Sequence, residues 1–262
     1  MKFDIEDASG FRGQADAVFA PASEAELIAL LGKASEDRIP VTIAGAGTGV
    51  TGGRVPLGGW SVSLENFTAL EVANAEARAG AGVLLRDLQA AAARSRQFYA
   101  PDPTEQTACI GGTIATNASG SRGFRYGATR QHVLALRVAF MDGSIREFRR
   151  GDRIDFTVRT IRAPRTTKHA AGFLLAPAMD WIDLFVGSEG TLGVVTEARL
   201  KLLPATEDLL TGVVFFESDE AALTAVDRWR TRSRLRMLEY MDGPSIELLR
   251  PAWPDIPQRA AA

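Results

Sequence analysis

Hydrophobic and polar positions alternate with the period of a helix in some segments of the chain and with the period of a strand in others. Residues 21–38, PASEAELIALLGKASEDR, place Leu27 and Leu31 on one helical face. Ser23 stands three residues before Glu26, which is the spacing of a capping box. The segment therefore predicts a helix that begins just after Ser23.

The other periodic segments mix both kinds of element. Apolar runs predict strands, an alanine-rich segment predicts a helix, and Asp142-Gly143 predicts a hairpin turn. In the first half of the chain we expect strands at 39–47 and 59–67, a helix at 83–98, and a short helix capped at Thr107 and ending at 117–120. In the second half we expect a hairpin at 133–148, irregular chain at 149–181 and a strand within 184–204. Both 212–232 and 235–250 are expected to form a strand followed by a helix. Strands and helices do not alternate as in a parallel doubly wound sheet, so the expected fold class is α+β.

Composition argues against several classes of function. The chain has 262 residues, of which 46% are hydrophobic and 24% charged, with a formal net charge of −2. A nucleic-acid-binding domain would carry a basic surface, so this charge argues against that role. Cys109 is the one cysteine in the sequence, which rules out an internal disulfide and a cysteine-rich metal site. No apolar run reaches transmembrane length and no signal-peptide core is visible, so we expect a cytoplasmic protein.

A glycine-rich loop, GAGTGVTGG at residues 45–53, contains the dinucleotide fingerprint G-x-G-x-x-G. A Rossmann site needs a helix directly after these glycines, but Pro56, Gly58 and Gly59 follow and disfavour one. The loop can instead form a nest, in which successive backbone N–H groups converge on an anion. A run of tight turns between strands fits this segment equally well.

Two further glycine-rich segments follow the first. One is PDPTEQTACIGGTIATNASGSRGFRYG at residues 101–127, and the other is GSEGTLGVVTEARL at 187–200. Each alone is typical of a connection between elements. Three such segments, each next to a strand, indicate a binding site for an extended cofactor with a diphosphate at its middle.

In this order the three segments resemble the FAD-binding oxidoreductases of the vanillyl-alcohol oxidase / p-cresol methylhydroxylase (PCMH) type. The similar branch is that of D-lactate dehydrogenase, the glycolate oxidase flavoprotein subunit and D-2-hydroxyglutarate dehydrogenase. The resemblance covers residues 15–210. It implies a two-subdomain PCMH-type FAD-binding fold, followed by the start of an α/β cap domain.

The resemblance also implies which residues hold FAD. The first loop is expected to wrap the diphosphate through its amides: Gly45, Ala46, Gly47, Thr48, Gly49, Val50, Thr51 and Gly52. The second segment is expected to lie along the flavin, the ribityl chain and the diphosphate: Pro101, Asp102, Pro103, Thr107, Gly111, Gly112, Ala115, Thr116, Asn117, Ser119, Ser121, Tyr126 and Gly127. The third is expected near the adenosine: Glu189, Gly190, Gly193, Val194 and Val195. Relatives with covalent flavin carry a histidine in the first loop, where this chain has Thr48, Gly49 and Val50, so noncovalent FAD is expected.

The implied reaction is oxidation of a 2-hydroxy acid such as D-lactate or glycolate, with hydride transfer from Cα to flavin N5 and a base that takes the hydroxyl proton. The electrons would then pass to a quinone, a cytochrome or another protein.

The chain departs from the family pattern in its C-terminal part. We expect an FAD-binding domain at 1–210, an incomplete strand–helix–strand cap at 211–250 and a disordered tail at 251–262. The relatives continue into a cap that supplies the catalytic histidine, the metal ligands and basic groups for the substrate carboxylate. No catalytic residue and no metal site are therefore assigned here. The apolar side chains left by a partial cap are expected to form an exposed patch: Phe215, Phe216, Trp229 and Leu235.

The two histidines do not replace the missing groups. His132 stands where a strand is expected to begin and is interpreted as structural. His169 and Lys168 lie in a segment that approaches the flavin in the relatives, where Lys168 is either a stabiliser of the reduced flavin or a surface cation.

Two hypotheses of function remain. The first is a flavin-dependent 2-hydroxy acid dehydrogenase, present as its FAD-binding half. The alternative is a non-catalytic FAD-binding subunit or a truncated fragment that needs a second chain, either to supply the cap or to accept electrons. Such a partner would also permit peripheral association with the inner membrane.

Overall fold

The computed structural model describes residues 2–162, 164–166, 168–206, 208–231, 235–253 and 255–257. Its strands are β1 (Phe3–Glu6), β2 (Arg12–Ala15), β3 (Ala17–Phe19), β4 (Val41–Ala44), β5 (Trp60–Ser63), β6 (Leu70–Ala73), β7 (Glu76–Gly80), β8 (Gln97–Tyr99), β9 (Val133–Ala139), β10 (Ile145–Arg149) and β11 (Val194–Pro204). Its helices are α1 (Glu24–Glu36), α2 (Leu85–Arg94), α3 (Ile110–Ala115), α4 (Gly123–Tyr126), the 3-10 helix η1 (Thr129–His132), α5 (Trp181–Phe185), α6 (Asp219–Trp229) and α7 (Gly243–Leu249). The mixture confirms the α+β class.

The N-terminal subdomain is a three-stranded parallel sheet in the order β3-β5-β4, with α1 between β3 and β4 in the sequence. The Ser23 hydroxyl accepts a hydrogen bond from the amide of Glu26 at 3.2 Å, which confirms the predicted start of α1. The Glu26 carboxylate reaches back to the amide of Ala22, one residue before the expected partner. Leu27 and Leu31 are fully buried, as the helical period predicts.

The larger subdomain is an antiparallel sheet in the order β10-β9-β11-β7-β6, with β8 paired to the end of β11. Side chains from α2, α3 and α5 join those of β9 and β11 in one hydrophobic core, which includes Leu88, Ile114 and Leu200 at 0% exposure. Gly143 has φ +79° between β9 and β10, and the Asp142 carboxylate accepts the amide of Ser144, which confirms the predicted hairpin turn.

Helix α3 begins later than the sequence suggested. Its cap is Cys109, whose thiol accepts the amide of Gly112 at 3.4 Å, and not Thr107. The hydroxyl and the amide of Thr107 both donate to Glu105 instead. The helix ends at Ala115, before the predicted 117–120, and Asn117 follows its C-cap with φ +49°.

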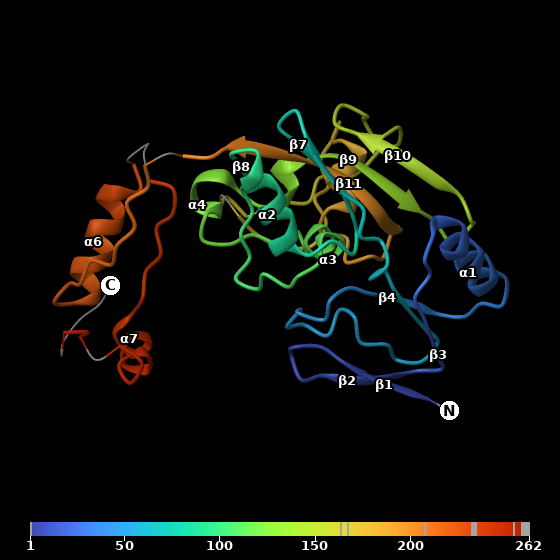
Figure 1. Ribbon diagram of the computed structural model, residues 1–262, viewed down its shortest axis with the longest axis horizontal. Coiled ribbons are helices and arrows are strands. Elements are labelled where there is room, and N and C mark those ends of the chain that lie inside the picture. The colour runs from blue at the N-terminus through green and yellow to red at the C-terminus, as the bar shows by residue number, and fades with distance from the viewer. Residues whose placement is uncertain are drawn as a thin grey trace.

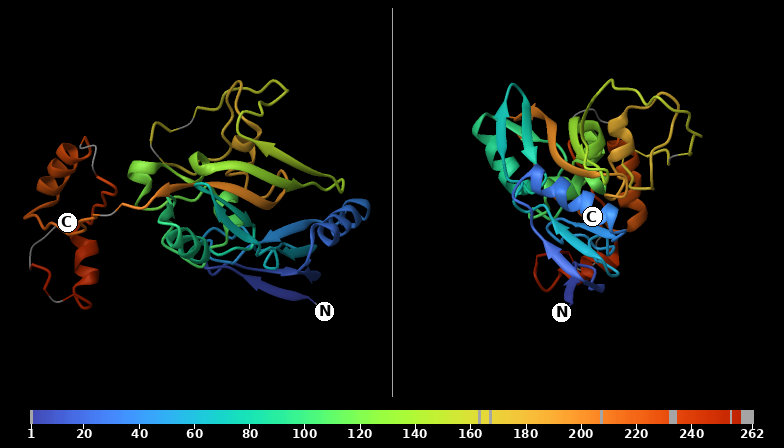
Figure 2. Two further views of the ribbon diagram at one scale, coloured as in Figure 1. Left: turned by 45° about the horizontal axis from the view of Figure 1, so that its top comes forward. Right: turned by 90° about the vertical axis from the view of Figure 1, so that its right-hand side faces the viewer.

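Residues 208–257, as far as they are described, form a C-terminal lobe that contains α6 and α7 and lies to one side of the two subdomains, which together we call the body (Figures 1 and 2). In place of the expected strand–helix–strand, the described residues of this region form two helices and no strand ladder. Ile256 of the predicted tail is buried at 4% exposure, while residues 258–262 lie outside the described part.

The predicted apolar patch is also different from the one observed. Phe215 packs on Trp253 and Phe216 packs on Trp229, with ring centroids 5.7 and 5.9 Å apart. These rings are therefore partly buried, as is Leu235. The exposed apolar side chains of the lobe are others, among them Leu210 at 98% and Leu248 at 83%.

In the described part of the chain, none of the helices has both the length and the apolar character needed to cross a bilayer.

Candidate cofactor-binding site

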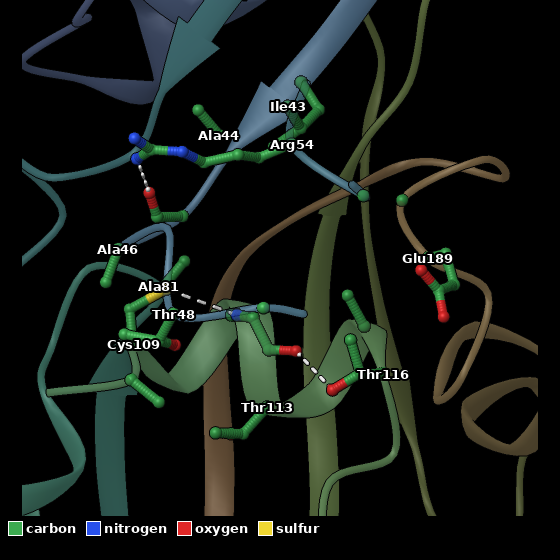
Figure 3. Close-up of a pocket in the computed structure, with 18 of the residues that line it drawn as sticks. Ile43, Ala44, Ala46, Thr48, Arg54, Ala81, Cys109, Thr113, Thr116 and Glu189 are labelled. Carbon is green, nitrogen blue, oxygen red and sulfur yellow. Dashed lines mark hydrogen bonds between the residues drawn. The ribbon is translucent and has the colours of Figure 1, made fainter. Parts of the chain in front are cut away.

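A cavity of 270 Å³ lies where the two subdomains meet. The three glycine-rich segments, which are far apart in the sequence, line it together with Ala81, the residue after β7 (Figure 3). Every lining residue belongs to the body. The cavity is the place where an extended ligand would contact all three motifs.

The first loop begins directly after β4, because its glycines allow backbone angles that end the strand. Gly47 and Gly52 have φ of +78° and +77°, in the left-handed region that glycine adopts most readily. The carbonyl of Gly47 accepts the amide of Ala8 at 3.1 Å, and the amide of Gly52 donates to the Asp7 carboxylate at 2.8 Å. These bonds tie the loop to the hairpin of β1 and β2.

The amides between these two tethers are available to a ligand. Within the described residues, the backbone N–H groups of residues 46–51 donate to no protein acceptor. Unpaired amides in succession form an anion-binding nest. The loop therefore has the donors that a diphosphate requires.

Charged side chains also border the loop. Arg54 donates from Nε to the carbonyl of Glu6 at 3.0 Å and from Nη1 to the carbonyl of Gly45 at 3.2 Å. Hydrogen bonds from the Ser9 hydroxyl first, and from the amides of Ser9 and Gly52, hold the pKa of Asp7 below its ordinary value of 3.8, against a smaller opposing effect of burial. Asp7 is thus the ionised anchor of the loop.

The opposite wall is the start of α3, where small residues allow the backbone segments to approach closely. A Cβ on Gly111 would lie 2.8 Å from the Cβ of Ala81, and a Cβ on Gly45 would lie 2.7 Å from the Sγ of Cys109. Neither position has room for a side chain. The result is a smooth, weakly polar wall, which suits a flat aromatic ligand.

The third wall is the segment before β11. Its turn is hydrogen-bonded to α3 through two amides: Gly187 donates to the carbonyl of Ile114 at 3.0 Å and Glu189 donates to that of Ala115 at 2.8 Å. Glu189 has φ +54°, and its carboxylate lies against Gly53 of the first loop, 3.3 Å from where a Cβ on Gly53 would be. Val194 and Val195 follow at the beginning of β11.

The structure brings most of the expected binding residues to this cavity. Those that line it are Gly45, Ala46, Gly47, Thr48, Gly49, Thr51, Pro103, Gly111, Gly112, Ala115, Thr116, Glu189, Gly190, Gly193, Val194 and Val195. Those that the structure does not place in its lining are Val50, Gly52, Pro101, Asp102, Thr107, Asn117, Ser119, Ser121, Tyr126 and Gly127.

Several of the expected residues outside the lining have side chains that bind other parts of the protein. The Asn117 side chain accepts the amide of Arg130 at 3.0 Å and donates to the carbonyl of His169 at 3.1 Å. Asp102 forms an ion pair with Arg122 at 2.6 Å. These residues shape the protein around the cavity.

Other lining residues were missed by the sequence analysis: Asp7, Ile43, Ala44, Gly53, Arg54, Leu64, Ala81, Glu105, Ala108, Cys109, Thr113, Ala118, Phe185 and Ser188. Arg54 had a local signal, because it is a charge placed directly after a run of glycines. Asp7 had none, since it meets Gly52 across 45 positions of sequence.

The two histidines and Lys168 lie outside the cavity lining. His132 is 5% exposed and donates from Nε2 to the carbonyl of Tyr126 at 2.9 Å, and burial lowers its pKa from the ordinary 6.5. Lys168 donates to the carbonyl of Gly120 at 3.0 Å. Among the described residues, no group of three or more His, Cys, Asp or Glu side chains is arranged to hold a metal ion.

The fold and cavity define an α+β domain for a nucleotide cofactor. Residues 15–149 match the model of the FAD binding domain family, and the chain belongs to this family. It is 37% identical to D-lactate dehydrogenase of Archaeoglobus fulgidus over 234 residues, 88% of this chain and 48% of the relative. It is 34% identical to glycolate oxidase subunit GlcD of Bacillus subtilis over 242 residues, 90% of this chain and 47% of the relative.

Among solved structures, alkyldihydroxyacetonephosphate synthase is similar, with a TM-score of 0.70 at 19% identity over 91% of this chain and 41% of that one. This likeness supports the PCMH-type fold. The chain spans less than half of the length of the relatives named here.

FAD is the cofactor of this family, and the residues present fit it. The loop offers unpaired amides for the diphosphate, and Gly45 and Gly111 let the loop and α3 pack closely against Cys109 and Ala81 at the wall of the cavity.

Proposed function

We propose that the chain holds FAD noncovalently in this cavity and is the FAD-binding part of a flavin-dependent dehydrogenase of 2-hydroxy acids. The observation that carries the proposal is the convergence of three separate glycine-rich segments on one cavity, with unpaired loop amides on one side and a smooth wall on the other. The names of the relatives, D-lactate dehydrogenase and glycolate oxidase, supply the substrate class.

In this proposal each wall of the cavity contacts a different part of FAD. The amides of residues 46–51 bind the diphosphate, the α3 wall at Gly111 and Gly112 lies against the flavin ring, and the segment from Glu189 to Val195 borders the adenosine. FAD, when bound, supplies the acceptor for the hydride. The cavity lining contains no histidine, in keeping with noncovalent attachment.

The described residues of the cavity do not provide an evident catalytic base. Asp7 and Glu105 are occupied by hydrogen bonds from Gly52, Ser9 and Thr107. Glu189, the third carboxylate of the lining, belongs to the segment proposed to border the adenosine and not the flavin. The base, and the groups that hold the substrate carboxylate, are therefore expected from outside residues 1–210, which we propose as the FAD-binding domain. Residues 211–250 would then begin a second domain.

The alternative is a non-catalytic FAD-binding subunit or a fragment that needs a second chain. Its support is the C-terminal lobe, in which Leu210, Leu248 and other apolar side chains are exposed. A partner that covers them would complete the lobe.

Anaerobic reduction tests whether the chain oxidises a 2-hydroxy acid without a second chain. The chain is loaded with FAD and mixed with D-lactate, L-lactate or glycolate, and the flavin absorbance is followed without oxygen. If the chain supplies every group that the oxidation needs, this absorbance is lost when a 2-hydroxy acid is added. Flavin that stays oxidised with all three, but is reduced by dithionite, shows that the chain binds FAD without supplying the base. Failure to bind FAD contradicts both hypotheses.

A further inference from the structure

Arg54 is the one basic side chain that lines the cavity, among the lining residues of the described chain. Its guanidinium lies against the glycine loop, with Cζ only 2.4 Å from where a Cβ on Gly47 would be. Figure 3 shows it beside the loop, bonded to the carbonyl of Gly45. The missing side chain at Gly47 therefore makes room for this cation.

The two backbone contacts of Arg54 leave donors unused. Nε is taken by the carbonyl of Glu6 and Nη1 by that of Gly45. In the described part of the chain, Nη2 has no acceptor and no carboxylate forms an ion pair with the group. A guanidinium keeps its charge at all ordinary pH values and presents planar donors that match phosphate oxygens.

The other charges of the cavity are negative. Asp7, Glu105 and Glu189 all line it, so three carboxylates oppose one cation. Two of these carboxylates lie close to the glycine loop, because Glu189 Oε2 is 3.3 Å from where a Cβ on Gly53 would be and Asp7 Oδ2 is 3.8 Å from where a Cβ on Gly49 would be. A diphosphate on the unpaired amides of residues 46–51 therefore needs a positive charge beside it, and among the lining residues Arg54 supplies that charge.

We propose that Arg54 is a diphosphate-binding residue of the FAD site, which pairs with the phosphates through its free guanidinium edge. This inference rests on the proposed function, because it assigns a ligand group within the same cavity.

The test compares the full chain with R54Q, which removes the charge, and R54K, which retains it. FAD affinity is measured by flavin fluorescence at low and at high salt. R12Q is the matched control, since Arg12 pairs with Glu6 on the neighbouring hairpin but does not line the cavity. Circular dichroism verifies that each variant is folded.

We expect R54Q to bind FAD about tenfold to a hundredfold more weakly at low salt, as for the loss of one charge-assisted hydrogen bond. Its affinity should depend less on salt than that of the wild type, because one screened attraction is gone. R54K should keep most of the salt dependence, and R12Q should resemble the wild type.

Equal affinity and equal salt dependence in the wild type and R54Q would overturn the assignment of Arg54. A weaker R54Q whose salt dependence is unchanged would also overturn it, since the residue would then only shape the loop. A wild type that binds no FAD contradicts the proposed function itself, which is a different result.

Discussion

The body and the C-terminal lobe are built from similar proportions of apolar sequence, yet only the body buries it in a continuous core. In the body Leu136, Ile114 and Leu200 have 0% exposure within one cluster that spans the sheet and its helices. In the described residues of the lobe, the buried hydrophobic side chains are Ala222, Ile246 and Ile256.

All residues that line the cavity belong to the body, so the cofactor site rests on the well-packed part. The difference indicates that FAD binding and lobe packing are separable. Variants in the two regions should therefore affect different measurements.

The largest contrast is expected between core truncations in the two regions. Leu200→Ala should lower the free energy of unfolding of the body by about 2–5 kcal/mol, because it leaves a cavity at the centre of the sheet. Ile246→Ala in α7 should leave body unfolding unchanged within about 0.5 kcal/mol, because distant sites act independently. Urea denaturation followed by tryptophan fluorescence and by bound flavin measures both. If Leu200→Ala and Ile246→Ala lower the free energy of unfolding equally when it is followed by the flavin signal, the two regions unfold as one cooperative unit.

The next effect concerns the contact that holds α1 on the large sheet. Glu24 accepts hydrogen bonds from Arg137 Nε at 2.7 Å and from the Thr196 hydroxyl at 2.6 Å, and Thr196 sits at a bulge of β11 next to Val195 of the cavity. Glu24→Gln should cost about 1–2 kcal/mol of stability and weaken FAD binding, since the two subdomains form opposite walls. Thermal melts with and without FAD measure this.

Asp37→Asn is the control for the Glu24 variant, because the ion pair of Lys33 with Asp37 on the same helix is exposed. Its effect should stay within about 0.5 kcal/mol. If both variants bind FAD like the wild type, Glu24 does not position the cavity walls.

A smaller effect is expected at the contact between lobe and body. The guanidinium of Arg236 lies 4.2 Å from the centroid of the Phe98 ring and 5.9 Å from that of Tyr126. Arg236→Ala should remove about 0.5–2 kcal/mol of docking energy and speed proteolysis of the lobe, while FAD affinity stays constant. Arg228→Ala, on the exposed side of α6, is the control. A loss of FAD affinity in Arg236→Ala would contradict the separation of lobe and cofactor site.

The smallest effect is a pH dependence of the body. Burial holds the pKa of His132 below its ordinary 6.5, and its Nδ1 is buried without a partner among the described residues. The unfolded chain therefore takes up a proton at higher pH than the folded one, so stability falls as the pH drops below 6.5.

His132→Gln should reduce the loss of stability between about pH 7.5 and about pH 5.5, the range in which histidine titrates. His169→Gln is the control and should leave this loss unchanged. Thermal melts across this range measure it. Equal pH profiles for the wild type and His132→Gln would show that His132 is not the responsible group.

The parts of the fold with local signals could be predicted from the sequence. Ser23 marked the start of α1, and Asp142-Gly143 marked the hairpin, because a cap and a tight turn depend on a few adjacent residues. The cap of α3 was assigned wrongly because Thr107 has the hydroxyl that is typical of a cap, whereas in the structure this hydroxyl donates to Glu105 and Cys109 caps the helix.

Features that depend on contacts between residues far apart in the sequence could not be predicted. The segments around Phe215 and Met237 have strand-like composition, but a strand needs a neighbouring strand along its length, and the described lobe contains only an isolated bridge residue, Phe216, and no sheet. The same reason hid Asp7, whose role follows from a contact with Gly52. The glycine-rich segments were recognised as a set, whereas the side of each loop that faces the cavity required the fold.

The most direct test of the account is whether the purified chain takes up FAD that acid releases. The visible absorption spectrum is recorded after incubation with FAD and gel filtration, and the protein is then precipitated with acid. The account predicts a flavin spectrum that elutes with the protein and moves fully to the supernatant. A folded chain, verified by circular dichroism, that elutes without flavin would contradict it, and flavin that stays in the pellet would contradict noncovalent binding.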